Sequence, residues 1–310
     1  MLLDRAIVRV LPAVPRPVVK RLSERYIAGS ELADACRVVR RLNEQGKLAT
    51  IDVLGEEAAR RDEAQALVEE YMHVFETIRE RGLDSNVSVK PTGLGLKLDR
   101  GLARDNIARI VRCASERNNF VRIDMEDSST TSDTLAIYRE LRAQGHENVG
   151  IVLQARLRRT LDDIRELADL RPSVRVCKGI YVEPPEIAYQ EDQEVRENFV
   201  RAVDELLAAH SYVAVATHDE WVIDETQRLF QKHRRGRSEY EFQMLLGVRE
   251  HLGDALVREG HRVRIYVPFG RRWYEYSIRR LQENPAIAGY VAVDTLNRLV
   301  PRRDGRNPRA

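Results

Sequence analysis

Two adjacent arginines, Arg279 and Arg280, stand in the short segment YEYSIRRLQENP at residues 274–285. The proline that closes the segment disfavours helix just before it, so the preceding residues are predicted to form a short helix. Helical spacing of i, i+3, i+4 and i+7 gathers four of them on one face, namely Tyr276, Arg279, Arg280 and Glu283. Paired guanidinium groups present forked donors that match a carboxylate or a phosphate.

A solvated ion pair is the plainer interpretation of this helix. Arg279 and Glu283, at i and i+4, would then contribute only about a few tenths of a kcal/mol to stability. The rest of the chain decides between that interpretation and an anion-binding face.

Composition describes an ordinary globular chain. Its 310 residues are 43% hydrophobic and 32% charged, and 51 basic against 49 acidic residues leave a net charge of +2. That balance gives no field for nucleic acid, so no nucleic-acid partner is expected, although KHRRGR at residues 232–237 is a local basic run. The three cysteines are odd in number and far apart, which favours a reducing cytoplasm over a disulfide framework. No histidine pair has metal-ligand spacing, so no metal is expected.

The amino-terminal segment MLLDRAIVRVLPAVPRPVVK has charges within its apolar part, which argues against a secretory signal. No apolar stretch approaches the roughly 20 residues needed to cross a bilayer. The apolar side chains of this segment either pack against the main domain or rest on a membrane surface. We therefore expect a cytoplasmic protein, with peripheral contact at the inner face of the cell membrane as an open alternative.

Eight short runs of apolar and β-branched residues alternate with segments of helical composition. The runs occupy residues 47–54, 86–90, 120–125, 148–154, 173–179, 211–219, 240–245 and 262–268. Helices are predicted over residues 16–45 and 57–81, the second ending at Gly82. Strands that are apolar on both faces and alternate with helices are typical of parallel sheets covered by helices.

Eight such units in about 250 residues predict a closed (β/α)₈ barrel. The alternative, a doubly wound open sheet, is weakened because no Gly-x-Gly-x-x-Gly follows an early strand. We expect an N-terminal helical segment at residues 1–45, the barrel at residues 46–300 and a polar tail at residues 301–310.

In such barrels the active site lies at the carboxyl ends of the strands, so the polar residues that end the runs are candidates for function. In chain order they are Asp52, Lys90, Asp124, Glu126, Gln154, Arg175, Lys178, Thr217, His218, Asp219, Gln243 and Tyr266. Single members have structural explanations, such as helix capping by Thr217 or a core position for His218. Together, Lys90, Arg175, Lys178 and the arginine pair would gather five cations at one mouth, a repulsion that a bound anion would relieve.

A small carboxylate and a pyrophosphate form one ligand set for these cations. Lys178 and Gly179 could hold a phosphate-bearing cofactor, because glycine permits close backbone approach and a helix beginning there would favour negative charge. The arginine pair would hold the substrate carboxylate. Two alternatives stay open at this point: an aldolase with Lys90 as its Schiff-base nucleophile, and a barrel that binds anions without catalysis.

The chain resembles the proline dehydrogenase family, in particular its short monofunctional bacterial members, over about residues 20 to 300. The most specific part is Tyr276-x-x-Arg279-Arg280-Leu281-x-Glu283-Asn284, which follows RIYVPFG. Further matches occur in order along the chain: VSVKPTGLG, VRIDMEDS, IVLQA, RVCKGIY, ATHD and EFQMLLG. Two positions depart from the family pattern, Ile180, where alanine is commoner, and Pro91.

The resemblance implies a distorted (β/α)₈ barrel whose eighth helix lies over the mouth and whose strand ends carry FAD. The implied FAD contacts are Met125, Gln154, Arg175, Lys178, Gly179, Ile180, Thr217 and His218. Arg175 is expected near the flavin N5, where a permanent cation would stabilise the negative charge of the reduced ring. The implied substrate site binds the proline carboxylate with Lys90, Arg279 and Arg280 and surrounds its ring with Tyr266, Tyr276, Tyr181 and Leu245.

The same resemblance implies a catalytic Asp124, which we expect to orient a neighbouring cation, since a carboxylate beside lysine and arginine is a poor base. Glu283 is expected to pair with an arginine when the site is empty. The implied reaction oxidises L-proline to Δ1-pyrroline-5-carboxylate, the first step of proline catabolism to glutamate. Electrons are expected to pass to a quinone, and the product to a separate pyrroline-5-carboxylate dehydrogenase.

Overall fold

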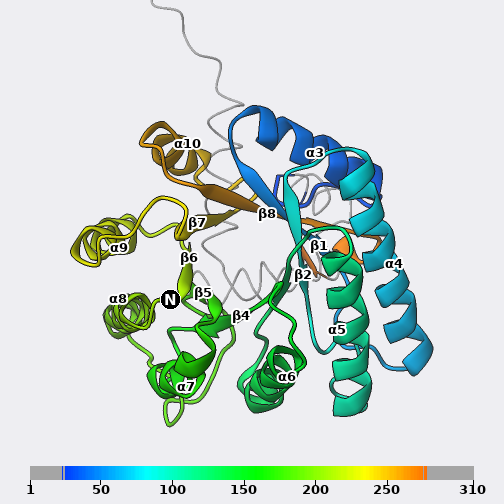
Figure 1. Ribbon diagram of the computed structural model, residues 1–310, viewed down its shortest axis with the longest axis horizontal. Coiled ribbons are helices and arrows are strands. Elements are labelled where there is room, and N and C mark those ends of the chain that lie inside the picture. Colours follow the sequence, from blue (N-terminus) through cyan, green and yellow to red (C-terminus); the bar gives the residue numbers. More distant parts are fainter. Residues whose placement is uncertain (1–22, 24, 275, 278–310) are drawn as a thin grey trace, which may run out of the picture. The chain divides into compact units, whose positions relative to one another are not determined.

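The computed structural model describes residues 23, 25–274, 276 and 277. Its eight strands close into a parallel barrel in chain order, with β8 pairing back to β1 (Figure 1). The predicted closed barrel is therefore confirmed, and the alternative of an open doubly wound sheet is wrong. Residues 24–273 form one compact unit that contains the whole barrel, and the few described residues outside that range belong to a second unit. The predicted domain boundaries at residues 45 and 300 stay predictions.

Every predicted strand is present, with small differences at its ends. The strands are β1 (Leu48–Val53), β2 (Ser85–Val89), β3 (Val121–Ile123), β4 (Val149–Gln154), β5 (Ser173–Cys177), β6 (Tyr212–Ala216), β7 (Tyr240–Leu245) and β8 (Val263–Phe269). Residues at the middle of each strand are buried, because helices cover the outer face and the opposite strands cover the inner one.

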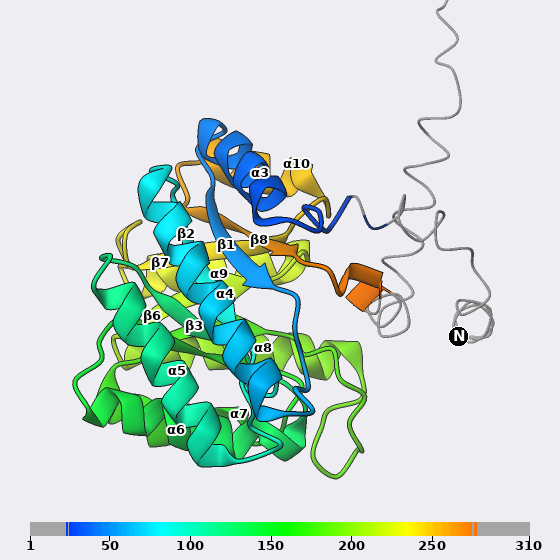
Figure 2. The same ribbon diagram turned by 90° about the vertical axis from the view of Figure 1, so that its right-hand side faces the viewer.

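Helices surround the strands, and α4 and α5 pack side by side along one flank (Figure 2). The helices are α3 (Leu32–Glu44), α4 (Arg61–Glu80), α5 (Arg100–Ser115), α6 (Thr131–Ala143), α7 (Thr160–Leu167), α8 (Asp192–Ala208), α9 (Glu220–Lys232) and α10 (Glu250–Arg258). Two short 3₁₀ turns, η2 (Ser128–Thr130) and η3 (Ala168–Leu170), complete the described elements. Within the described residues, no helix is both long and apolar enough to cross a membrane.

The helix predicted over residues 16–45 is wrong in its described middle part. Residues 25–31 form a turn, and α3 begins at Leu32. Gly29 has a φ of +146°, and a Cβ there would lie 2.3 Å from an oxygen of Asp34. Asp34 accepts a hydrogen bond from the backbone N–H of Glu31 at 3.1 Å, so its carboxylate caps the start of α3. The helix predicted over residues 57–81 is largely confirmed as α4, which starts at Arg61: Glu57 has a positive φ of 51°, and the N-cap residue Arg60 is still extended.

Polar side chains fill much of the barrel interior. Arg122 of β3 is 2% exposed, and its guanidinium donates to the carbonyl oxygens of Ile151 at 3.0 Å and Ser173 at 2.6 Å. A Cβ on Gly150, its neighbour in register on β4, would lie 2.4 Å from that guanidinium, so glycine makes room for it. Burial lowers the pKa of Arg122 to about 9, and the nearby charge of Arg175 contributes to the shift. The interior below the mouth is thus a charged layer rather than an apolar one.

Candidate active site

Lys90, directly after β2, is buried among acceptors from neighbouring strands. Its Nζ donates to both carboxylate oxygens of Asp52 at 2.7 Å and to the hydroxyl of Tyr266 at 3.1 Å. Glu56 and Asp124 lie further out, with carboxylate oxygens 3.8 and 3.9 Å from Nζ. The three nearest acceptors match the three donors of an ammonium group, so a Schiff-base nucleophile at this position would first have to break these contacts. This geometry speaks against the aldolase alternative.

Asp124, directly after β3, joins Lys90 to Arg175. One of its oxygens accepts from Arg175 Nη1 at 2.6 Å and from the hydroxyl of Ser88 at 3.0 Å. The other accepts from the hydroxyl of Tyr266 at 2.9 Å. The structure therefore brings four of the predicted site residues into one hydrogen-bonded cluster, Lys90, Asp124, Arg175 and Tyr266.

Arg175 of β5 is held on three sides. Besides the contact with Asp124, its Nη2 donates to the Ser88 hydroxyl at 3.0 Å and its Nε donates to the side-chain oxygen of Gln243. The guanidinium carbon lies 5.4 Å from the centre of the Tyr266 ring. Because each nitrogen has a defined acceptor, the plane of the guanidinium is fixed before any ligand binds.

The cations of this cluster are neutralised within the protein. Asp52 is fully buried beside Lys90, and Asp124 pairs with Arg175, so these two of the five expected cations have counter-charges within the protein. Burial raises the pKa of Asp52 to about 6, although the charge of Lys90 acts in the opposite direction. An anionic ligand that binds here must therefore meet further cations or displace one of these carboxylates.

A third buried carboxylate, Glu126, lies close to Lys90. Glu126 accepts from the backbone N–H of Thr92 at 2.8 Å and from the Thr92 hydroxyl at 2.6 Å. Burial raises the pKa of Glu126 to about 7 despite these two hydrogen bonds. Gln154, at the end of β4, donates to the backbone oxygens of Met125 and Glu126 at 3.2 and 3.1 Å, which fixes the loop after β3.

Lys178 and Gly179 follow β5 as predicted, but the helix expected to begin there is absent from the described chain. Residues 178–191 run as loop and turn until α8 begins at Asp192. Lys178 Nζ lies 2.5 Å from a carboxylate oxygen of Asp219, which Arg196 also contacts at 2.7 Å. The expected helix start therefore gives no support to a phosphate site, whereas two features still do: the positive φ of +96° at Gly179, and the one positive charge that Asp219 leaves on Lys178 and Arg196.

His218 lies at the end of β6 as a neutral acceptor. Its Nε2 accepts from the backbone N–H of Leu245 at 3.0 Å, which leaves the proton on Nδ1. Burial lowers the pKa of His218 to about 4, and the nearby Arg249 adds to this effect. Thr217 accepts from the backbone N–H of Asp219 at 3.1 Å, close to the capping role considered for it.

Other predicted site residues fall outside this unit or outside the described residues. Tyr276 belongs to the second compact unit, in which the hydroxyls of Ser23 and Ser277 lie 2.7 Å apart. Arg279, Arg280 and Glu283, and with them the helix expected over the mouth, lie outside the described residues. Ile180 and Tyr181 are partly exposed in the loop after β5.

Sequence reasoning assigned no role to several residues that the structure brings to the site. Asp52 and Gln243 were recognised as strand ends, but their contacts with Lys90 and Arg175 were not. Ser88 was missed although it precedes Lys90 by two positions, the spacing that places both side chains on the inner face of β2. Glu56 and Thr92 lie in loops after strands, where the sequence carries no periodicity to mark them.

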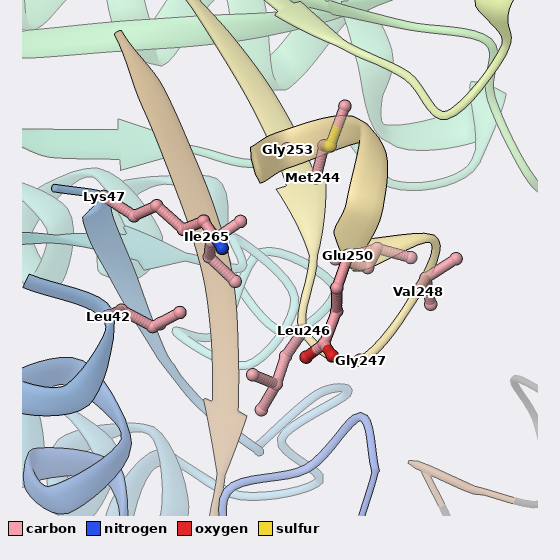
Figure 3. Close-up of a pocket in the computed structure, with 10 residues that line it drawn as sticks. Leu42, Lys47, Met244, Leu246, Gly247, Val248, Glu250, Gly253 and Ile265 are labelled. Carbon is pink, nitrogen blue, oxygen red and sulfur yellow. The ribbon is translucent and has the colours of Figure 1, made fainter. Parts of the chain in front are cut away.

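A small cavity on the outer side of β7 and β8 is a different feature (Figure 3). It is lined by residues that include Leu42, Lys47, Met244 and Ile265, and its volume is about 10 Å³. That volume is at the lower limit for one water molecule, so the cavity is too small for an amino acid or a flavin. The carboxyl end of the barrel is the better candidate site.

Comparisons with known proteins give the family of this chain. A family model described as proline dehydrogenase matches residues 35–292. Proline dehydrogenase 1 of Bacillus subtilis subsp. natto is 40% identical over 269 residues, which cover 87% of this chain and 89% of that protein. Proline dehydrogenase of Deinococcus radiodurans is 37% identical over 294 residues, which cover 91% and 95%.

The fold of this chain is similar to that of a solved structure. It is proline utilization A (PutA) from Bdellovibrio bacteriovorus inactivated by N-propargylglycine, with a TM-score of 0.80 at 23% sequence identity. The match covers 89% of this chain and 36% of that one, so this chain spans about a third of that protein's length.

Proposed function

Since this chain belongs to the proline dehydrogenase family, we propose that it oxidises L-proline to Δ1-pyrroline-5-carboxylate with FAD bound across the strand ends. The observation that carries the proposal is the buried cluster of Lys90, Asp124, Arg175 and Tyr266 at the carboxyl end of the barrel. Its residues lie in, or directly after, four different strands, and their side chains hold one another through defined hydrogen bonds. A cluster of this kind presents fixed polar groups to a small substrate, which favours one reactive orientation.

The ends of β4 to β6 fit a phosphate-bearing flavin. A Cβ on Gly179 would lie 3.3 Å from the Cβ atoms of Arg156 and Gln154, so glycine keeps this wall open. Lys178 and Arg196 share the single carboxylate of Asp219, which leaves one positive charge for a phosphate. We assign as FAD contacts Met125, Gln154, Arg175, Lys178, Gly179, Ile180, Thr217 and His218.

Arg175 has the main electrostatic role in this proposal. FAD supplies the acceptor for two electrons, and its ring gains negative charge when it is reduced. A permanent cation held by Asp124, Ser88 and Gln243 stabilises that charge without having to reorient during the reaction. Because part of that negative charge develops already in the transition state, the cation stabilises the transition state more than the oxidised starting state, which is the condition for catalysis.

Asp124 acts in the proposal as an orienting group rather than as a base. It accepts hydrogen bonds from Ser88, Arg175 and Tyr266, so its oxygens are engaged in holding these neighbouring side chains. Its role is to keep Arg175 and the hydroxyl of Tyr266 in place next to the substrate.

The substrate carboxylate needs more than Lys90. Because Asp52 already accepts from Lys90 twice, we assign the larger share of carboxylate binding to Arg279 and Arg280, with Glu283 as their partner in the empty site. Tyr266, Tyr276, Tyr181 and Leu245 are proposed to surround the apolar part of the proline ring. We further propose a quinone as the electron acceptor, reached by peripheral membrane contact of a cytoplasmic protein, and a separate pyrroline-5-carboxylate dehydrogenase as the consumer of the product.

Anaerobic titration with L-proline tests the proposal. The purified protein is expected to bind FAD and to lose its flavin absorption as L-proline is added. A bound flavin whose spectrum L-proline leaves unchanged would refute the substrate, and a protein that cannot be loaded with FAD would refute the cofactor.

The same titration tests the arginine pair. Arg280→Met should raise the apparent dissociation constant for proline roughly 10- to 150-fold, which corresponds to a charge-assisted hydrogen bond of about 1.5 to 3 kcal/mol. Arg201→Met, on the exposed face of α8, is the matched control and should leave that constant unchanged. Equal constants for the two variants would remove Arg280 from the substrate site.

A further inference from the structure

A second charged layer lies directly beneath Arg175 and is not used by the proposed reaction. Glu241 and Gln243 are two positions apart on β7, so both side chains point into the barrel. Gln243 is in register with Arg264 of β8. Glu241, Gln243 and Arg264 are 2%, 5% and 9% exposed, so water competes little for their hydrogen bonds.

These three residues form a directed chain of hydrogen bonds that ends at Arg175. Arg264 donates from Nε to both oxygens of Glu241, at 2.9 and 3.1 Å, and from Nη1 to the backbone oxygen of Ala49 at 2.7 Å. Glu241 accepts from the side-chain N–H of Gln243 at 2.5 Å. The side-chain oxygen of Gln243 accepts from Nε of Arg175.

The direction of this chain is determined by its charges. A carboxylate only accepts, so Glu241 forces the amide N–H₂ of Gln243 to point downward and the amide oxygen to point up at Arg175. Burial alone would raise the pKa of Glu241, but the charge and hydrogen bonds of Arg264 lower it overall, so the carboxylate form persists. With Glu241 neutral or absent, the amide of Gln243 could turn over and present N–H groups to a cation.

We propose that Gln243, oriented by the Glu241–Arg264 ion pair, is a positioning residue that fixes the guanidinium plane of Arg175 against the flavin. The proposal rests on the function proposed above, in which Arg175 stabilises the reduced ring. Asp124 and Ser88 hold the two terminal nitrogens of Arg175 from one side. Gln243 holds Nε, the third corner, and thereby prevents rotation about the line between the other two contacts.

The test is the midpoint potential of the bound flavin in Gln243→Leu, measured beside its affinity for proline. Loss of the Nε contact should shift the balance between reduced and oxidised flavin about tenfold toward the oxidised form. That shift equals about 30 mV for a two-electron couple. The rate constant for flavin reduction by proline should fall about tenfold, while the dissociation constant for proline changes less than about twofold.

A matched control separates positioning from a general loss of packing. Thr50→Val removes the buried hydrogen bond between Thr50 and Asn86 in the same interior, at a position where the structure gives no contact with Arg175. It should lower the melting temperature as Gln243→Leu does, but leave the flavin potential unchanged. A potential that moves equally in both variants would overturn the proposal, because a merely structural role explains that result.

A second variant keeps the test decisive if Gln243→Leu does not fold. The exchange of Glu241→Gln together with Gln243→Glu retains the net charge and an acceptor for Nε of Arg175, but moves the carboxylate one link closer to Arg175 and leaves Arg264 Nε one oxygen at position 241 instead of two. It should lower the flavin potential, while the proline dissociation constant stays close to that of the unaltered protein. An unchanged potential in this folded variant would overturn the proposal.

Arg175→Lys distinguishes failure of this inference from failure of the proposed function. If Arg175→Lys lowers the potential and Gln243→Leu does not, the positioning role is refuted and the function stands. If neither variant alters the potential, the role of Arg175 is itself wrong, and the inference falls with it.

Discussion

Replacing Glu126 by glutamine should change the pH dependence of stability in a direction set by one buried carboxylate. Burial raises the pKa of Glu126 from 4.5 to about 7, so the folded protein retains a proton that the unfolded chain releases between those values. Stability is therefore lost as pH rises from about 4.5 to about 7, and the loss is complete above that window. The difference of about 2.5 pKa units corresponds to about 3.4 kcal/mol, at 1.36 kcal/mol for each unit.

Glutamine is a suitable replacement because it preserves the local hydrogen bonds. Its amide oxygen can accept from the backbone N–H of Thr92 and its amide N–H₂ can donate to the Thr92 hydroxyl, where Glu126 now accepts from both. The variant therefore removes the ionisation while keeping the contacts. Asp52, whose pKa is also raised, contributes equally to both proteins and cancels from the comparison.

The assay is the melting temperature of Glu126→Gln and of the unaltered protein, both at pH 5 and at pH 8. About 2.5 kcal/mol of the linkage lies between these two pH values. With an unfolding entropy of about 2.1 cal/mol/K per residue, the variant should gain roughly 4 °C on the unaltered protein when pH is raised from 5 to 8. The same substitution at exposed Glu166 on α7 should give no such gain. A difference between the two proteins that is the same at both pH values would refute this reasoning.

Two further predictions follow from the backbone at Gly179 and from the state of His218. The Gly179→Ala variant should have a lower melting temperature and retain less FAD than the Gly145→Ala variant. Both glycines have a positive φ, +96° at Gly179 and +86° at Gly145, so alanine at either position carries a strain of about 1–2 kcal/mol. Only the Cβ at position 179 would also meet other side chains. Equal melting temperatures and equal flavin content would contradict this expectation. In ¹⁵N-labelled protein, His218 should stay neutral with its proton on Nδ1 down to about pH 5.5, because burial lowers its pKa to about 4. A titration of its ring near pH 6.5, assigned by comparison with His218→Asn, would show that the ring is not buried as described.

The barrel was predictable because its signal is local. Each strand is a short run that is apolar or β-branched on both faces, and this pattern does not depend on which strand becomes its neighbour. The same argument located Lys90, Asp124 and Arg175, because polar residues that end such runs share the carboxyl end of the barrel. The family resemblance then assigned their roles, which the structure leaves as proposals.

The pairings inside the barrel were not predictable, because they depend on register between strands far apart in sequence. Asp52 and Lys90 are 38 residues apart, and Ser88 and Arg175 are 87 apart. A shift of one residue in either strand would turn these side chains to the opposite face. Two local errors have a different cause. The helix predicted over residues 16–45 is interrupted by the positive φ of Gly29, and the helix expected to begin at Gly179 has no capping residue to start it.

The barrel closes only when β8 has been synthesised, because β8 pairs with both β7 and β1. In β8, Arg264 is the ion-pair partner of Glu241, and the Tyr266 hydroxyl contacts both Lys90 and Asp124. The last strand of the barrel thus supplies partners for charged side chains in β7 and directly after β2 and β3. A nascent polypeptide released only as far as β7 would bury Glu241 without that counter-charge and leave the edges of β1 and β7 open. The buried charges of this unit are therefore paired only when almost all of the unit has been synthesised. A chain truncated before β8 is expected to be a substrate for chaperones and proteases.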